Sequence, residues 1–185
     1  KYLITRTCPA CDGTRLGERV RSTLIDGIDL GEASRLTLTE LREWVQRVPG
    51  LVPDEVAPMA RVIVEEMSEP MDRLVQLGLS YLSLDRASST LSNGERQRVQ
   101  LARAVRNRTT GVLYVLDEPT IGLHPSNVDG VLAIIRELLA DGNSAVVVDH
   151  DTRVLAAADH LIEIGPGAGA DGGRVIFQGP INEAS

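Results

Sequence analysis

The sequence predicts an α/β fold with a parallel sheet in its second half. Two apolar runs, Val112–Leu116 and Ala145–Val148, have the length of strands, and no polar residue alternates with their apolar ones. Strands of this kind are buried on both faces, as in a parallel sheet that helices cover. Helices are expected at about 94–107 and 126–139, before and between the two runs. Helices that alternate with buried strands are typical of α/β folds.

The first half of the chain is expected to be mainly helical. The segment Thr37–Glu40 has a capping-box pattern, which predicts the start of a helix that reaches about Val48. A second helix is expected to follow, and we interpret its apolar stripe over 59–75 as core. A short strand is expected at Val20–Leu24, before these helices.

The C-terminal part is expected to hold a short helix after Asp151 and two more strands, Leu161–Ile164 and Arg174–Phe177. A glycine-rich segment, 165–173, lies between these strands. It lacks the Gly-Lys-Ser/Thr ending with which a P-loop grips phosphates. We therefore interpret it as a hairpin connection.

Composition excludes several classes of protein. Hydrophobic residues make up 43% of the 185, enough for a core, but no run approaches the roughly 18 apolar residues of a membrane span. No signal peptide is evident, and the first residue is Lys1 rather than Met, which suggests a piece of a longer protein. The only two cysteines are Cys8 and Cys11, too few for a secreted disulfide framework, so a cytoplasmic location is expected.

Charge gives a mixed signal about nucleic acid. The net charge is −7, so the surface as a whole is not basic. Five arginines nevertheless lie between Arg96 and Arg108. They form either a solvated helix face or a local contact with DNA, and the charge pattern leaves both open.

Two adjacent acids, Asp117 and Glu118, follow the first apolar run. The carboxyl ends of strands are where open α/β sheets bind ligands. There one acid can hold a magnesium ion while the other orients an attacking water. Taken alone, this pair is equally consistent with an ordinary strand end.

The segment Leu91–Glu95 opens the helix that is expected from about Gly94. The hydroxyl of Ser92 and bare backbone N–H groups at the positive end of a helix dipole make an anion-binding site. An ordinary N-cap without a ligand explains the same residues.

His150 ends the second apolar run, 32 residues after Glu118. In a parallel sheet it would lie at the same edge as the two acids. An imidazole there can hydrogen-bond a terminal phosphate and respond to its loss.

The order and spacing of these signals resemble the ABC ATPase superfamily. Leu91–Glu95 is similar to the signature motif, Val112–Glu118 to Walker B, Gly122–Pro125 to the D-loop and His150 to the switch histidine. Further segments resemble the UvrA family of excinuclease ATPases: Cys8–Leu16, Gly78–Leu84, Val112–His124, Ala158–Gly169 and Asp171–Gly173. The match covers nearly the whole chain and resembles the second half of the first of that family's two cassettes.

This resemblance implies an ABC-type ATPase subdomain with a parallel sheet core over 91–185. A mainly helical segment with half of a zinc site would precede it over 1–90. No P-loop is present in the chain, so the chain alone is expected to be inactive, and ATP hydrolysis would belong to the full-length parent.

The resemblance also implies a role for each motif residue. Ser92, Asn93, Gly94 and Glu95 would contact the γ-phosphate of ATP that is held on the P-loop of the second ABC cassette. Asp117 would be the Mg²⁺-associated carboxylate, Glu118 would polarise the hydrolytic water, and His150 would sense the γ-phosphate.

Cys8 and Cys11 have the spacing of half a Zn²⁺ site. A structural site needs four ligands, and the sequence holds no other cysteine. His124 and His160 are possible substitutes, but both lie far along the chain, in the segment of the ATPase motifs. The family resemblance implies that the missing ligands precede Lys1. Two reduced cysteines in a turn that bind no metal are the alternative.

The implied function is recognition of DNA damage in nucleotide excision repair, driven by ATP. The implied partners are a damaged DNA duplex, a second copy of the parent in a homodimer, and UvrB. Two departures from the family pattern, Asn93 for glycine and Asp149 for glutamate, leave open a UvrA-like ATPase of antibiotic resistance. A truncated, non-catalytic interaction module is a third alternative.

Overall fold

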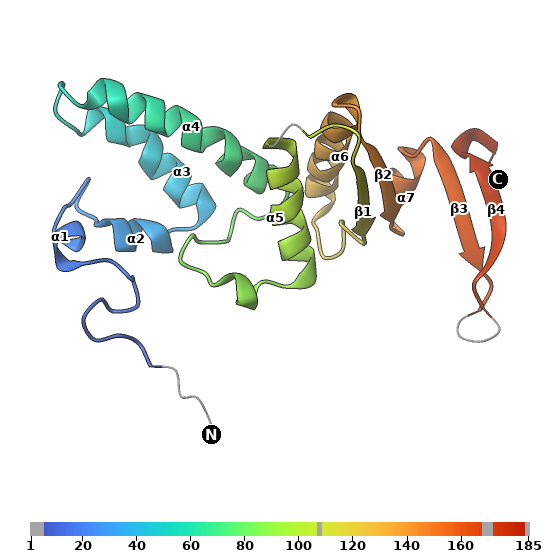
Figure 1. Cartoon of the computed structure of the whole chain (residues 1–185), viewed down its shortest axis with the longest axis horizontal. Coiled ribbons are helices and arrows are strands. Elements are labelled where there is room, and N and C mark those ends of the chain that lie inside the picture. The colour runs from blue at the N-terminus through green and yellow to red at the C-terminus, as the bar shows by residue number, and fades with distance from the viewer. Residues whose placement is uncertain (1–5, 107–108, 168–171, 184–185) are drawn as a thin grey trace. The chain divides into compact units, whose positions relative to one another are not determined.

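The computed structural model describes residues 6–106, 109–167 and 172–183 (Figure 1). The chain folds into two compact units, 1–106 and 107–185. The first is helical and the second holds all four strands of the described residues. The predicted division of the chain into 1–90 and 91–185 lies where the signature motif begins, not where one compact unit ends. It stays a prediction.

Unit 1 contains five α-helices among its described residues: α1 (Glu18–Arg21), α2 (Leu30–Arg35), α3 (Leu38–Arg47), α4 (Ala57–Gln76) and α5 (Asn93–Arg106), with single 3-10 turns η1 (Val48–Gly50) and η2 (Ser88–Thr90). The strand predicted at Val20–Leu24 is wrong. Its first residues belong to α1, and the backbone then turns tightly between Ile25 and Ile28, which form an isolated bridge. The two apolar residues of this segment, Val20 and Leu24, both lie exposed, so burial does not favour a strand here.

The helix predicted from the capping box is confirmed as α3. The N–H of Thr37 donates to Glu40 Oε2 at 2.9 Å, and the N–H of Glu40 donates to Thr37 Oγ1 at 3.3 Å. Helix α2 is absent from the sequence-based expectations, although Asp29 and Glu32 form the same reciprocal pair at its start. At six residues, α2 is too short to show an apolar period.

Helix α4 lies beside α3 (Figure 1), and its apolar stripe is only partly core. Met71 is buried in the main cluster of unit 1, which also holds the fully enclosed Leu79. At the other end of the stripe, Met59 remains 69% exposed and Ile63 50%. The interpretation as core is therefore wrong for Met59 and Ile63, which line an open apolar pocket of unit 1 together with Trp44 of α3.

Unit 2 begins with two strands, β1 (Leu113–Asp117) and β2 (Ser144–Val148), which pair in parallel. Helix α6 (Pro125–Ala140) connects them, because parallel neighbours need a long crossover. This confirms the predicted parallel sheet. The turn predicted after α6 also forms, with Gly142 at φ +84°, a backbone conformation that glycine adopts without strain.

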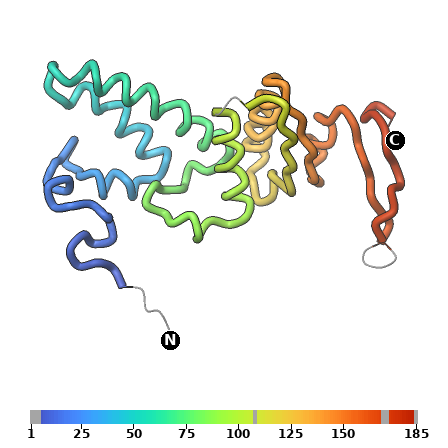
Figure 2. The backbone as a smooth tube through the Cα atoms, viewed as in Figure 1, coloured from blue at the N-terminus to red at the C-terminus, as the bar shows by residue number. Residues whose placement is uncertain are grey.

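The rest of unit 2 consists of α7 (Thr152–Ala156), β3 (His160–Gly165), β4 (Arg174–Pro180) and the 3-10 turn η4 (Ile181–Glu183). Strands β3 and β4 run side by side and antiparallel (Figure 2). The predicted hairpin partner strands are thus present. The middle of the glycine-rich segment, 168–171, lies outside the described residues.

Only one face of the β1–β2 sheet is covered within the described residues. Leu116 is buried on the side of α6, whereas Val115 on the opposite face is 65% exposed and Val146 51%. The expectation that helices of this chain cover both faces is therefore wrong. The apolar character of the strands is explained by burial only on the α6 side.

No described helix combines the length and the apolar composition that a membrane crossing requires.

Candidate functional site

The signature segment forms a hydrogen-bonded turn at the start of α5. The N–H of Ser92 donates to Glu95 Oε2 at 2.6 Å, and the N–H of Glu95 donates to Ser92 Oγ at 3.2 Å. This is a capping box, so the alternative of an N-cap describes the local geometry correctly. The cap and an anion site do not exclude each other, because the Ser92 hydroxyl accepts this bond and can still donate one.

Glu95 is a buried acid at the centre of this turn, with 6% of its surface exposed. The Tyr81 hydroxyl donates to Glu95 Oε1 at 2.8 Å, and Arg86 Nη1 approaches the same oxygen at 3.3 Å. The bonds from the Ser92 N–H and the Tyr81 hydroxyl are the main causes that lower the pKa of Glu95 to about 2. Its carboxylate thus serves the turn itself, and its predicted contact with the γ-phosphate stays a prediction.

Asn93 and Gly94 form the first turn of α5. Neither has a positive φ, so asparagine in place of glycine causes no backbone strain here. The Asn93 side chain accepts a hydrogen bond from Arg96, which also donates to the Leu91 carbonyl at 2.6 Å. The first N–H groups of a helix have no intrahelical acceptor. The backbone of Asn93 and Gly94 therefore fits an incoming phosphate.

The Walker B acids lie at the carboxyl end of β1. Asp117 is the last residue of the strand, and Glu118 follows with φ +49°. A left-handed backbone is uncommon for a residue other than glycine and costs energy, and such strain gathers at functional sites. The Glu118 N–H donates to the Val148 carbonyl at 2.7 Å, which fastens this conformation to β2. No sequence signal marked this strain.

His150 lies at the same edge of the sheet as the two acids. The parallel register pairs Asp117 with Val148, so Glu118 and His150 follow the ends of adjacent strands. Both side chains are exposed. The structure thus brings together the acid pair and the histidine, as the sequence predicted for a parallel sheet.

Asp149 makes contacts that sequence reasoning missed. Its carboxylate accepts from the Thr120 hydroxyl at 2.7 Å and from the His150 and Asp151 N–H groups at 2.8 and 2.9 Å. Burial raises the pKa of Asp149, but these bonds outweigh it and hold the pKa below its usual value. The signal that could have indicated this bridge is an acid directly after an apolar strand, together with a Pro-Thr pair directly after the neighbouring strand.

Comparison with known proteins now identifies the family. The family model described as "ABC transporter" matches residues 19–121, more than half of the chain. This chain belongs to the ABC transporter family. The match ends just beyond the Walker B acids, so it includes the signature turn of α5.

More specific relatives carry the name UvrABC system protein A. The protein of that name from Thermus thermophilus is 43% identical over 98% of this chain, and the one from Bacillus subtilis is 39% identical over 99%. A crystal structure of UvrA2 from Deinococcus radiodurans matches 95% of this ABC family chain, with 37% identity and a TM-score of 0.82. The UvrA resemblance predicted from the sequence is therefore confirmed.

The chain spans about a fifth of the length of these relatives, since the match covers 19% of both proteins named above and 23% of the UvrA2 chain.

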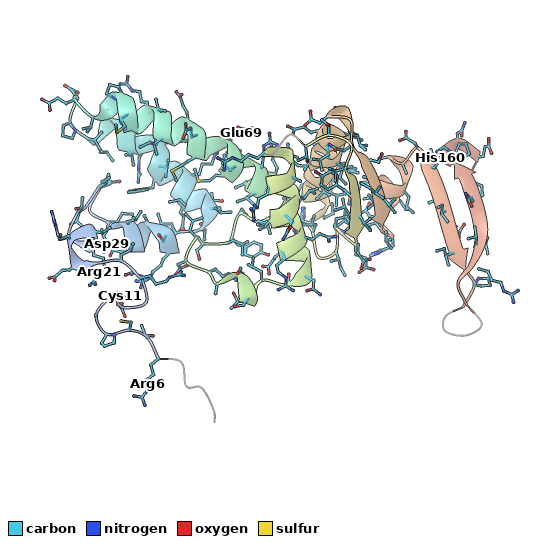
Figure 3. All side chains as sticks on the ribbon, in the orientation of Figure 1. Arg6, Cys11, Arg21, Asp29, Glu69 and His160 are labelled. Carbon is cyan, nitrogen blue, oxygen red and sulfur yellow. The ribbon has the colours of Figure 1, made fainter. Side chains whose placement is uncertain are left out.

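The cysteine pair of this ABC family chain lies in a turn before α1. The Asp12 N–H donates to the Cys8 carbonyl at 2.8 Å, and Arg21 donates to the Ala10 carbonyl at 2.6 Å (Figure 3 labels Cys11 and Arg21). Hydrogen bonds from the Ala10 and Cys11 backbone, and from the Cys11 side chain, lower the pKa of the Cys8 thiol. This turn therefore favours a thiolate at Cys8, the form in which a cysteine binds zinc. Within the described ranges no third or fourth His, Cys, Asp or Glu completes a metal site.

The arginines after the signature do not share one face of α5. Arg96, Arg103 and Arg106 are exposed, whereas Arg98 is buried. Arg108 lies outside the described residues. The local basic surface is thus smaller than the sequence count suggested.

Proposed function

We propose that this chain supplies the signature turn and the hydrolytic strand edge of an ATP-driven protein that recognises DNA damage in nucleotide excision repair. The observation that carries the proposal is the strained Glu118, held at the sheet edge beside the His150 turn by its 2.7 Å bond to Val148. Relatives named UvrABC system protein A, at about 40% identity over almost the whole chain, support the repair context.

The signature turn would bind ATP that lies on the P-loop of a second cassette. The Ser92 hydroxyl and the N–H groups of Asn93 and Gly94 would meet its γ-phosphate at the positive end of the α5 dipole. Glu95 would hold this turn in shape through its bond to Ser92, and the chain itself contains no P-loop sequence.

The strand edge would supply the chemistry of hydrolysis. Asp117 would hold Mg²⁺, which neutralises charge on the phosphates when it is bound. Glu118 would orient the attacking water, and the His150 imidazole would hydrogen-bond the γ-phosphate. Phosphoryl transfer depends mainly on such positioning and electrostatics.

The parent protein would act on DNA with several partners. It would contact a damaged duplex through charge and shape rather than base sequence, and the exposed Arg96, Arg103 and Arg106 are candidates for this surface. A homodimer of the parent and an interaction with UvrB belong to the same proposal, as does a cytoplasmic location. Cys8 and Cys11 would give half of a Zn²⁺ site that ligands outside this chain complete.

A second candidate is a UvrA-like ATPase of antibiotic resistance. The observation that favours it is divergence inside the motifs, where Asn93 and Asp149 replace residues common in the family. Binding of the parent to damaged and intact duplexes, with and without an intercalating drug, separates the two: repair requires a preference for damage without the drug.

The test of the catalytic assignment is Glu118→Gln in the full-length parent, with the equivalent glutamate of the other cassette already disabled. Glutamine keeps the shape but loses the charge that orients water. Single-turnover hydrolysis should fall by ~10²–10³ while ATP affinity changes little, by comparison with the loss of one preorganised contact. Asp117→Asn should instead weaken binding of Mg-ATP.

The matched control is Glu163→Gln, the same change at an exposed position of β3. It should leave both hydrolysis and binding unchanged. If Glu118→Gln hydrolyses ATP as fast as this control, Glu118 is only a strand end and the proposed function loses its catalytic residue.

A further inference from the structure

The Asp149 carboxylate joins two turns that come from different strands. Asp149 follows β2, and Thr120 lies in the turn that follows β1, 29 residues earlier. The Thr120 hydroxyl lies 2.8 Å from Oδ1 and 2.7 Å from Oδ2, and the Thr120 N–H donates to Oδ2 at 3.3 Å. Oδ1 also accepts from the N–H groups of His150 and Asp151.

These bonds use the acceptor capacity of the carboxylate within the protein. An ionised Asp offers about four lone-pair sites, and here four donor groups are directed at it. Asp149 therefore has little capacity left to hold a metal ion or to serve as a base. Its position between the two turns instead points to a role in holding them together.

The bridge lies between the two groups that the proposed function places at the γ-phosphate. Thr120 is buried, with 7% of its surface exposed, and follows the fully buried Pro119, so this part of the turn is packed against the protein. Glu118 precedes this Pro-Thr pair with its strained φ of +49°. On the other side of the bridge, the backbone of His150 is itself a donor to Asp149.

We propose that Asp149 is a positioning residue, which couples the turn that carries Glu118 to the turn that carries His150. This inference rests on the proposed function, because it assigns to Asp149 the relative placement of its two catalytic groups. Both turns are exposed at their tips, and the bridge limits how far one can shift against the other.

Two substitutions weaken the bridge in different ways. Asp149→Asn keeps one carbonyl oxygen for the His150 and Asp151 amides but turns an N–H toward the Thr120 N–H, so the bond from this N–H is lost and the Thr120 hydroxyl keeps only an uncharged partner. Thr120→Val removes only the hydroxyl at nearly constant shape, and Thr120→Ser retains it. The control is Asp159→Asn, the same chemical change at an exposed Asp of unit 2.

The experiment measures single-turnover ATP hydrolysis and ATP affinity of the full-length parent with the other site disabled. Displacement of a catalytic group by about 1 Å can cost ~10²-fold in rate. We expect Asp149→Asn and Thr120→Val to slow hydrolysis by ~10–100-fold with affinity within about threefold, and Thr120→Ser to stay within about threefold of the parent. The double variant should lose no more than the worse single one, because both remove the same link.

The results show whether Asp149 positions the two catalytic groups or only stabilises the fold. If Asp149→Asn and Thr120→Val both hydrolyse within about twofold of Asp159→Asn while Glu118→Gln is inactive, the inference is overturned and the proposed function stands. If Glu118→Gln is also active, the proposed function fails first. If Asp149→Asn does not fold, as calorimetry of the parent would reveal, the milder pair Thr120→Val and Thr120→Ser decides the question.

Discussion

Two motif turns of this chain are each held by a carboxylate, but the two carboxylates differ in how far along the sequence they reach. Glu95 contacts Ser92, Arg86 and Tyr81, the most distant of which is 14 residues away. Asp149 reaches Thr120, 29 residues away, across a pair of parallel strands. The signature turn can thus assemble from one continuous stretch, whereas the sheet edge with Glu118 and His150 forms only when β1 and β2 have paired.

Because of this difference, we expect mutations to affect the stability of the two units differently. The signature turn should tolerate changes elsewhere as long as its own short segment folds. The sheet edge with Glu118 and His150 should depend on every contact that fixes the register of β1 and β2. The predictions below test this contrast on the chain itself.

The largest effect is expected for Asn143→Ala, at the end of the two strands opposite to Asp149. The Asn143 side chain accepts from the Val112 N–H at 3.0 Å and donates to the carbonyls of Thr109 and Leu138 at 2.8 and 2.9 Å. Alanine removes the side-chain partner of the Val112 N–H and the Thr109 carbonyl, whereas the Leu138 carbonyl still accepts from the backbone N–H of residue 143. The free energy of unfolding of unit 2 should therefore fall by about 2–4 kcal/mol. Amide hydrogen exchange of β1 and β2 measures this loss.

The only tryptophan of the chain, Trp44, lies in α3 of unit 1 and serves as the internal reference. Its fluorescence transition should not move in Asn143→Ala, and Asn127→Ala in α6 should change neither probe by more than about 0.5 kcal/mol. If hydrogen exchange of β1 and β2 and the fluorescence transition of Trp44 shift by the same amount, the two units unfold together. The contrast between them would then be wrong.

A smaller effect is expected for Glu95→Gln in unit 1. Loss of the charge weakens the bonds from Ser92 and Tyr81, and hydrogen bonds to a charged group are worth about 1.5–3 kcal/mol. The pKa of Glu95 is depressed from 4.5 to about 2 in the folded state. Its stabilisation is therefore complete above about pH 4.5 and is lost as the pH falls toward 2.

Denaturant titration of Trp44 fluorescence at several pH values checks this sign. The difference between the parent chain and Glu95→Gln should be constant at neutral pH and should shrink in acid. The exposed Glu65→Gln in α4 provides the control. A difference that grows as the pH falls would contradict the assigned hydrogen bonds.

The smallest effect is expected on the uncovered face of the sheet. Val146→Thr should change the stability of unit 2 by less than about 0.5 kcal/mol, because Val146 is 51% exposed. Val131→Thr, at a fully buried position of α6, should cost about 1–3 kcal/mol for a hydroxyl placed in the core. Equal losses at both positions, measured by hydrogen exchange, would show that something covers this face in solution.

Local chemistry made much of the fold predictable. The capping pair Thr37–Glu40 defined the start of α3, because its two hydrogen bonds join residues three apart. The apolar runs identified β1 and β2, and their parallel pairing followed from the helix between them. The same pairing placed Glu118 and His150 at one edge, so the outline of the site was also predictable.

What the sequence by itself determined, then, was the identity and order of the motifs: the acid pair after β1, the serine at the start of α5 and the histidine after β2. Their signals depend on residues that are neighbours along the chain. Only the tertiary structure decided that Val20–Leu24 is not a strand, that Met59 stays exposed, that Glu118 adopts a left-handed backbone and that Asp149 bridges to Thr120. Each of these depends on contacts, or their absence, between residues that are far apart in the sequence, and a local sequence pattern does not show which distant residues meet.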